Sequence, residues 1–250
     1  MTGASKGIGH AVTRALAAEG AHVTAGARTS SPDLQDLVAA GSVDEVQVDL
    51  STREGPADLV AAAHPGGPID VLVNNVGVLT PHLGGFLETT EDDWSRALTL
   101  TLMAAVRTTR AALPGMLEEG RGTIVTVSSI NAFLPDPTII EYCAAKAALT
   151  NFSKALSKEV GPRGIRVNTV SPGPVSTDLW LGDDGVAARV GRATGGDPED
   201  VARQAAGRAA TGRFTAPAEV ADLVVMLAGD RAGNVTGADL VIDGGYVETL

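Results

Sequence analysis

Short apolar runs rich in β-branched residues alternate along this chain with longer, alanine-rich stretches of helical periodicity. The short runs cover residues 22–27, 43–48, 71–74, 123–127, 166–170 and 239–242. The helical stretches cover residues 8–19, 57–63, 91–117, 140–159 and 218–228. Strands that alternate with helices build βαβ units, which join into a parallel sheet covered by helices on both faces. The sequence therefore predicts a doubly wound α/β fold.

A single domain, residues 1–250, is expected because no repeat or low-complexity linker divides the chain. An α/β domain of this length buries most of its surface without a disulfide or a structural metal, and we expect no metal site. Residues 181–212 are rich in Gly, Asp, Ala and Arg. We expect this stretch to be a mobile substrate-loop excursion rather than a second domain.

Charge and cysteine content narrow the classes of partner. The formal net charge of −11 disfavours nucleic acid and anionic membranes. No apolar run approaches the roughly 20 residues that span a bilayer. Cys143, the only cysteine, has no partner for a disulfide within the chain, as is usual in a reducing compartment. We therefore expect a cytoplasmic protein with a small-molecule substrate.

A glycine-rich turn, Thr-Gly-Ala-Ser-Lys-Gly-Ile-Gly at residues 2–9, opens the first helical stretch. Glycine lets backbone amides approach a phosphate group closely, and the helix N-terminus adds its partial positive charge. The spacing differs from the G-x-G-x-x-G of common dinucleotide folds, and an ordinary glycine-rich loop is the alternative. The candidate phosphate-binding residues are Gly3, Ser5, Lys6, Gly7, Ile8 and Gly9.

A phosphate-binding turn of this kind normally follows a strand, yet Thr2 follows Met1 directly. We therefore expect the first strand to be missing or truncated. A misplaced start, with a GTG valine codon read as an initiator, is the favoured explanation. In that case the functional protein begins upstream of Met1 with a short strand rich in Val, Ala and Leu.

The end of the 22–27 run bears on the choice of cofactor. NAD-binding folds carry an acidic residue at this strand end, which binds the ribose 2′-hydroxyl. Here Ala27 stands there, with Arg28 beside it. Arg28 and Lys6 are predicted to bind a 2′-phosphate, which favours NADP. The alternative is that both are solvated surface charges.

Polar and glycine residues follow three further strands, where a crevice forms at the carboxyl edge of a parallel sheet. Asp49 is expected to accept a hydrogen bond from an adenine amino group, or to cap a turn with Ser51. The alternative for the later segments is an ordinary Asn/Gly or prolyl turn. The further candidate cofactor-binding residues are Asp49, Leu50, Asn75, Val76, Gly77, Pro172, Gly173, Val175 and Thr177.

Ser129, Tyr142 and Lys146 form the sharpest constellation. Tyr142 and Lys146 are four residues apart and share one helix face. A nearby ammonium lowers the pKa of a phenol, which would make Tyr142 a general acid/base. Ser129 follows the 123–127 strand, from where its hydroxyl could bind a substrate oxygen. A Tyr-x-x-x-Lys pair alone is common in helices and usually has no function. The upstream serine and the glycine turn make a catalytic role the favoured interpretation here.

The chain resembles the short-chain dehydrogenase/reductase family, of the shorter, roughly 250-residue type. The resemblance rests on residues 2–9, 74–77, 128–129, 142 with 146, 168–173 and 235–245, and it covers residues 2–246. It implies a Rossmann-like fold with a seven-stranded parallel sheet. It also implies that Lys146 binds the nicotinamide ribose, Ser129 holds the substrate oxygen and Tyr142 transfers the proton.

Two positions depart from the family pattern. Val76 replaces the alanine of Asn-Asn-Ala-Gly, which is a mild change. Thr101 stands where the family has an asparagine that supports a water in a proton relay. Its hydroxyl has a shorter reach, so the relay is in question. By the same resemblance, stretches 91–117 and 140–159 pack across a twofold axis, and we expect a homotetramer, with a dimer as the alternative.

We therefore predict an NADP-dependent short-chain oxidoreductase that transfers a hydride between NADP(H) and a carbonyl/alcohol pair. The alternatives are a non-catalytic, nucleotide-binding redox sensor on the same fold and an enzyme that uses NAD. Apolar residues flank the catalytic segments and predict an apolar substrate pocket beside Ser129, with core packing as the alternative. They are Phe133, Leu134, Ile139, Leu179 and Trp180.

Overall fold

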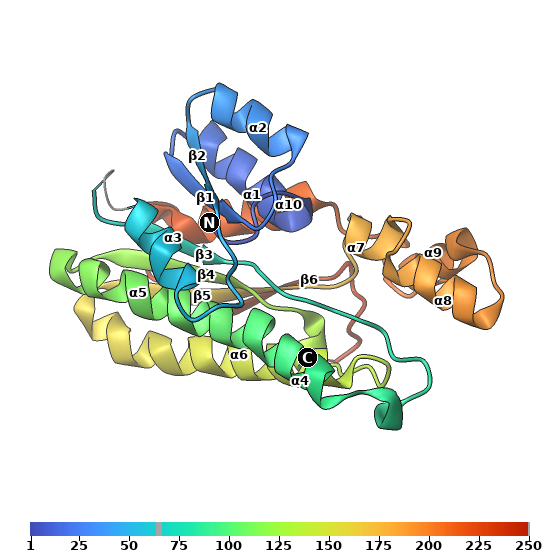
Figure 1. Cartoon of the computed structure of the whole chain (residues 1–250). Helices are drawn as coiled ribbons and strands as arrows, with labels where there is room; N and C mark the ends of the chain where they lie inside the picture. Colours follow the sequence, from blue (N-terminus) through green and yellow to red (C-terminus); the bar gives the residue numbers. More distant parts are fainter. Residues whose placement is uncertain (64–66, 250) are drawn as a thin grey trace.

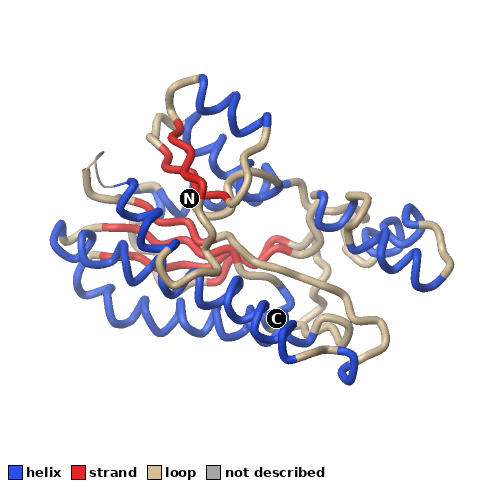
Figure 2. The backbone as a smooth tube through the Cα atoms, in the orientation of Figure 1, coloured by secondary structure: helices blue, strands red, loops and turns tan. Residues whose placement is uncertain are grey.

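A computed structural model describes residues 1–63 and 67–249 and shows parallel strands covered by helices on both faces (Figures 1 and 2). Each of the six predicted runs forms a strand, and every strand pair is parallel. The strands are β1 (Val23–Ala27), β2 (Val43–Gln47), β3 (Val71–Asn74), β4 (Gly122–Val127), β5 (Ile165–Pro172) and β6 (Asp239–Ile242). The predicted α/β class is confirmed.

The strands divide into two sheets, β1-β2 and β3-β4-β5-β6, instead of the one seven-stranded sheet that the resemblance implied. Residues 1–2 lie between β1 and β3 and form an isolated bridge there, Thr2 with Gly26. Thr2 donates from its backbone N to Val73 O (3.1 Å), and Gly26 N donates to Met1 O (2.8 Å). Met1 and Thr2 thus pair with both neighbouring strands near their carboxyl ends.

Behind Met1 the two sheets leave a cavity of about 400 Å³. Apolar side chains from α1, β1, α3 and β3 line it, among them Leu16, Val23, Leu59 and Val71. The α-amino group of Met1 is buried and donates to Thr24 O (2.8 Å), and burial lowers its pKa to about 6. The cavity therefore lies where a preceding stretch of strand would pair.

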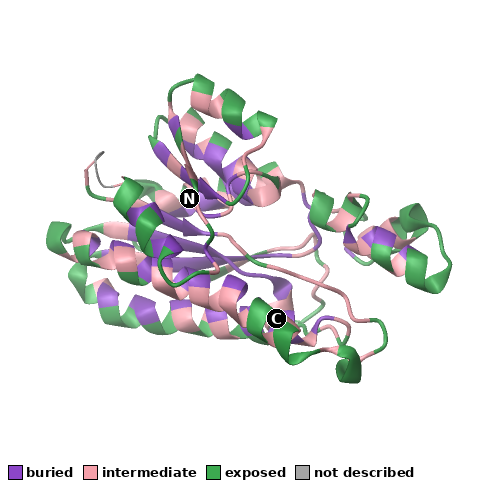
Figure 3. Cartoon of the chain, in the orientation of Figure 1, coloured by how far each residue is buried: buried purple, intermediate pink, exposed green. Residues whose placement is uncertain are grey.

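Helices cover the two faces of the larger sheet, whose strands are mostly buried between them (Figure 3). Val125 of β4 packs in the core with residues of α1 and α10, whereas its neighbour Ile124 packs in a second core with residues of α5 and α6. The helices are α1 (Gly7–Ala18), α2 (Pro32–Ala39), α3 (Gly55–Ala63), α4 (Glu91–Ala97), α5 (Ala104–Glu119), α6 (Ile140–Val160), α7 (Asp178–Leu181), α8 (Val186–Thr194), α9 (Pro198–Gly207) and α10 (Pro217–Ala228). None of the described helices is both long enough and apolar enough to cross a membrane.

Two helical stretches differ from their prediction. The continuous helix expected over 91–117 is interrupted by a π-helical segment, Leu98–Met103, between α4 and α5. This wider turn carries Thr101, which is fully buried. The 181–212 stretch contains α8 and α9, which extend away from the sheets beyond the end of β5 (Figure 1). The mobility of this stretch stays a prediction.

Candidate active site

The glycine-rich turn leads into the start of α1, and the backbone N atoms of Gly3 and Ala4 at its beginning donate to Gly26 O (2.8 and 3.1 Å). Gly3 and Gly7 have φ of 67° and 57°, a conformation that favours glycine. A Cβ on Gly9 would come within 1.9 Å of Gly3 O, so the turn packs tightly on the helix. The N-cap, Lys6, makes no side-chain cap, and the first turn of α1 holds no acidic residue. These features fit the phosphates of a dinucleotide such as NADP.

Residues predicted at the carboxyl ends of strands converge on this turn. Asn75 donates from Nδ2 to Thr2 O (3.1 Å) and to Gly3 O (3.3 Å). Its backbone N donates to Thr2 Oγ1 (2.8 Å). A Cβ on Gly7 would come within 3.3 Å of Thr177 Cγ2, so the segment after β5 also reaches the turn. In this arrangement the side chain of Asn75 holds the phosphate turn in place.

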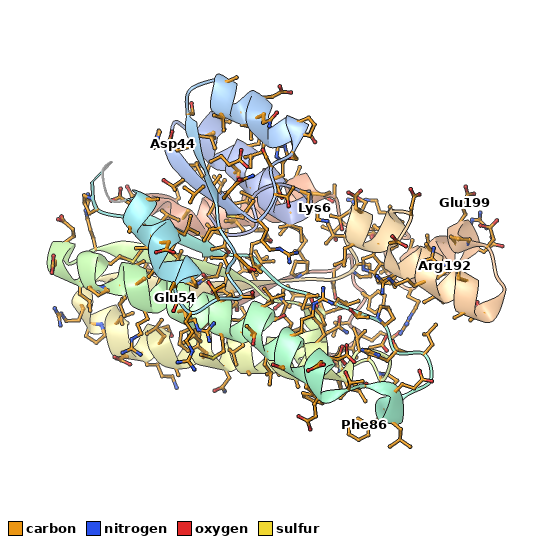
Figure 4. All side chains as sticks on the ribbon, viewed as in Figure 1. Lys6, Asp44, Glu54, Phe86, Arg192 and Glu199 are labelled. Carbon is orange, nitrogen blue, oxygen red and sulfur yellow. The ribbon has the colours of Figure 1, made fainter. Side chains whose placement is uncertain are left out.

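Arg28 and Lys6, the two predicted 2′-phosphate ligands, lie exposed on neighbouring loops. Ser31 Oγ donates to Ser5 O (2.7 Å), which ties the loop after β1 to the glycine turn. Figure 4 shows Lys6 near the start of α1, on the side toward α7. Asp49 accepts from Ser51 N (2.9 Å), so it caps a turn as the alternative interpretation held. This bond is the main reason that the pKa of Asp49 is lowered, and Arg28 contributes to it.

Ser129 at the end of β4 and Tyr142 and Lys146 in the first turns of α6 are all buried, with 7%, 9% and 3% of their surface exposed. Lys146 Nζ lies 5.7 Å from the centre of the Tyr142 ring and donates to Val127 O (2.7 Å). The structure therefore brings the three predicted catalytic residues together at one edge of the sheet.

Burial, rather than the ammonium, decides how Tyr142 titrates. Burial raises the pKa of Tyr142 to about 12, and a hydrogen bond with Ser129 opposes this only in part. Burial also lowers the pKa of Lys146 to about 7. The expectation that Lys146 lowers the phenol pKa is therefore wrong for this arrangement, because the lysine is itself desolvated.

Thr101 lies close to Lys146. Its Oγ1 accepts from Val78 N (3.4 Å). A Cβ on Gly77 would lie 3.7 Å from Thr101 Oγ1 and 3.5 Å from Lys146 Nζ. Both groups therefore lie next to Gly77. Because Val78 N already donates to the hydroxyl, Thr101 helps to hold the loop after β3.

The predicted substrate-pocket residues differ in how far they are buried. Phe133, Leu134 and Leu179 are exposed, whereas Ile139 is buried in a small core with Tyr142. Trp180 packs against Phe214, with ring centres 5.4 Å apart. The apolar side chain of Ile139 therefore serves core packing, as the alternative interpretation held.

Sequence reasoning missed polar residues that flank the catalytic segments. Asn131 hydrogen-bonds with Ser129, two positions upstream. Glu141, directly before Tyr142, is 3% exposed and lies 3.5 Å from Nε2 of His82. Asn131 and Glu141 could have been found from the sequence, because they lie next to Ser129 and Tyr142 in the chain. No local pattern pointed to His82, which comes from the loop after β3.

Comparison with known proteins decides the family. A family model described as enoyl-(acyl carrier protein) reductase matches residues 3–247, nearly the whole chain. The chain belongs to the short-chain dehydrogenase/reductase family. The members that match this chain are named as dehydrogenases and reductases, which are oxidoreductases.

Individual members of the family align over almost the full length of this short-chain dehydrogenase/reductase. The 3-oxoacyl-[acyl-carrier-protein] reductase of Thermotoga maritima is 34% identical, over 99% of this chain and 96% of that protein. The L-xylulose reductase of Bos taurus is 34% identical, over 100% and 96%. The crystal structure of L-sorbose reductase from Gluconobacter frateurii, complexed with NADPH and L-sorbose, superposes with a TM-score of 0.90. It is 35% identical, over 100% of this chain and 96% of its own.

Proposed function

We propose that this chain is an NADP-dependent short-chain dehydrogenase/reductase that transfers a hydride between NADP(H) and a carbonyl/alcohol pair. The observation that carries the proposal is the buried grouping of Ser129, Tyr142 and Lys146 at the same sheet edge as the phosphate turn. A redox sensor that only bound the nucleotide would have no use for a tyrosine, a serine and a lysine buried at one edge of the sheet.

The proposed cofactor site runs from the uncapped start of α1 to the end of β5. Backbone amides of the glycine turn would hold the phosphates, and Arg28 with Lys6 would bind the 2′-phosphate. When bound, NADPH supplies the hydride. A relative complexed with NADPH, at 35% identity, supports NADP over NAD.

Tyr142 is proposed as the acid in the reducing direction. With a pKa of about 12 its phenol is protonated at neutral pH and holds a proton for the substrate oxygen. Ser129 would donate a hydrogen bond to that oxygen as negative charge develops on it. Lys146, with a pKa near 7, would carry its charge in part and bind the nicotinamide ribose.

The test is NADPH consumption by the wild-type protein on a panel of ketones. The panel includes L-sorbose, L-xylulose and a 3-oxoacyl thioester, since these carbonyl compounds appear in the names of relatives. Phe133, Leu134 and Leu179 remain the proposed apolar pocket wall, and apolar ketones complete the panel.

Tyr142→Phe is expected to remove nearly all turnover, by at least about a hundredfold, while NADPH still binds. The ring packs as before and only the acidic proton is lost. Turnover is measured by NADPH absorbance and binding by calorimetry. Tyr246→Phe is the matched control, because Tyr246 is the only other tyrosine. Near-wild-type turnover in Tyr142→Phe would exclude this residue as the acid.

The redox sensor remains the second candidate because Thr101 replaces the family asparagine. A sensor predicts that NADPH binds tightly, that no ketone is reduced and that Tyr142→Phe changes nothing. The same measurements therefore separate the two functions.

A further inference from the structure

Asn131 makes three hydrogen bonds in the turn that follows Ser129. Its Nδ2 donates to Leu134 O (3.0 Å), and its backbone N donates to Ser129 Oγ (3.1 Å). Its Oδ1 accepts from Ser129 Oγ (3.2 Å). The side chain therefore bridges the proposed substrate-binding hydroxyl and the end of its own turn.

The bond to Leu134 fixes which way the amide faces. A carbonyl oxygen only accepts, so the amide nitrogen must point to Leu134 and the oxygen to Ser129. A serine hydroxyl has one proton and two lone pairs. Asn131 engages the proton through Oδ1 and one lone pair through its backbone N. The direction of the Ser129 hydroxyl is thus set by a single neighbouring residue.

Ser129 also lies beside Tyr142, since a hydrogen bond between them affects the phenol pKa. A hydroxyl held by Asn131 keeps a constant orientation toward the phenol while the substrate oxygen is not yet bound. When negative charge develops on that oxygen, it competes with the neutral Asn131 Oδ1 for the serine proton and is the stronger acceptor.

We propose that Asn131 is a positioning residue, which orients the Ser129 hydroxyl and holds its proton until the substrate oxygen takes over the hydrogen bond. The proposal rests on the proposed function, because it assigns Asn131 a role only through Ser129. A purely structural role, in which Asn131 closes the turn and does nothing else, is the competing explanation.

Two substitutions separate these explanations. Asn131→Ala removes Oδ1 and Nδ2 but keeps the backbone N–H bond to Ser129. Asn131→Leu does the same with nearly unchanged side-chain volume. Both are expected to lower kcat about tenfold, because a Ser129 hydroxyl without a fixed orientation must be ordered before it donates to the substrate oxygen. A tenfold loss corresponds to about 1.4 kcal/mol in the activation free energy. NADPH affinity should stay within about twofold of wild type. Asn234→Ala is the matched control, because Asn234 is exposed in the loop before β6.

A double-mutant cycle with Ser129→Ala gives the decisive readout, measured in single turnovers with enzyme in excess so that slow variants are still read. If Asn131 acts only through Ser129, then Asn131→Ala changes the rate less than about twofold in the Ser129→Ala background. A structural role predicts instead that the two losses multiply and that the melting temperature and NADPH affinity fall with each change.

The outcomes are distinct. The proposal is supported if Asn131→Ala lowers the rate in the wild-type background but leaves it unchanged in the Ser129→Ala background. Wild-type kcat in both Asn131 variants, or multiplying losses, overturns it while leaving the proposed function in place. Full activity of Ser129→Ala overturns the role of Ser129 itself, and with it both the proposed mechanism and this inference.

Discussion

Lys146 and Tyr142 share one face of α6, yet burial moves their pKa values in opposite directions. The lysine pKa is lowered to about 7 and the tyrosine pKa is raised to about 12, because burial disfavours the charged form of each. Both groups are therefore close to neutral near pH 8. The site stores little charge of its own, so it suits a reaction in which charge develops on the substrate oxygen.

Stability is expected to rise with pH above 7 because of Lys146. Below pH 7 the lysine is protonated in both the folded and the unfolded chain, and the full cost of burying the charge is present. Between pH 7 and about 10.5 the unfolded chain binds more protons, so the free energy of unfolding rises by up to about 1.4 kcal/mol per pH unit. Urea denaturation at several pH values measures this slope.

Lys146→Met should flatten that slope, since the substitution removes the titrating group. Lys158→Met is the control, because Lys158 is exposed on the same helix. An unchanged slope in Lys146→Met would show that another group causes the pH dependence.

Arg28 decides the choice between the two nicotinamide cofactors if the proposed 2′-phosphate site is right. Arg28→Ala should weaken NADPH binding by about 1.5–3 kcal/mol, the value of a hydrogen bond to a charged group, and leave NADH nearly unchanged. Calorimetric titration with each cofactor measures both affinities. Equal losses for the two cofactors would contradict the assignment.

At the scale of elements, the gap between β1 and β3 is the main irregularity of the fold. Met1 and Thr2 pair with both strands, but the cavity of about 400 Å³ behind them leaves the amino ends of β1 and β3 without a common neighbour. The buried amino group of Met1 adds a desolvation cost. These two features indicate that an added strand would be accommodated without rearrangement.

Extending the chain before Met1 with a short Val/Ala/Leu-rich segment should raise the melting temperature by several degrees. The segment would fill the cavity, pair in parallel with β1 and β3 and replace the buried amino group of Met1 by a peptide group. An extension of equal length made of Gly and Ser is the control, because it removes the same buried amino group but fills the cavity poorly. Identical melting temperatures for the two extended chains would contradict the expected pairing.

For the whole molecule, we propose assembly into a homotetramer. β6 is an edge strand, and Val241 on it is 46% exposed, so this edge is open to pairing or packing with another chain. α5 and α6 lie together on one face of the larger sheet (Figure 1), where the family resemblance places a second interface.

Light scattering at micromolar concentration is expected to give the mass of four chains, with two chains as the alternative. Val241→Lys, which puts charge on the exposed edge, should shift the mass toward dimer. Met226→Lys is the control for added surface charge, because Met226 of α10 is similarly exposed, at 42%. A monomeric mass for the wild-type protein would refute the assembly.

Local sequence patterns determined the strands, their alternation with helices along the chain and the positions of the chemical groups. Alternating periodicities report which residues are buried, so the six strands followed from the apolar runs. Ser129, Tyr142 and Lys146 could be placed together because four-residue spacing puts two of them on one helix face and a strand end supplies the third.

Only the tertiary structure decided what surrounds those groups. The raised pKa of Tyr142 comes from burial by several elements, and the π-helical turn that carries Thr101 interrupts a stretch whose periodicity looked continuous. Trp180 packs on Phe214, far along the chain, and Asn75 binds the backbone of the turn at Thr2. Desolvation and side-chain pairing depend on residues distant in sequence, and no local pattern reports which of them will meet.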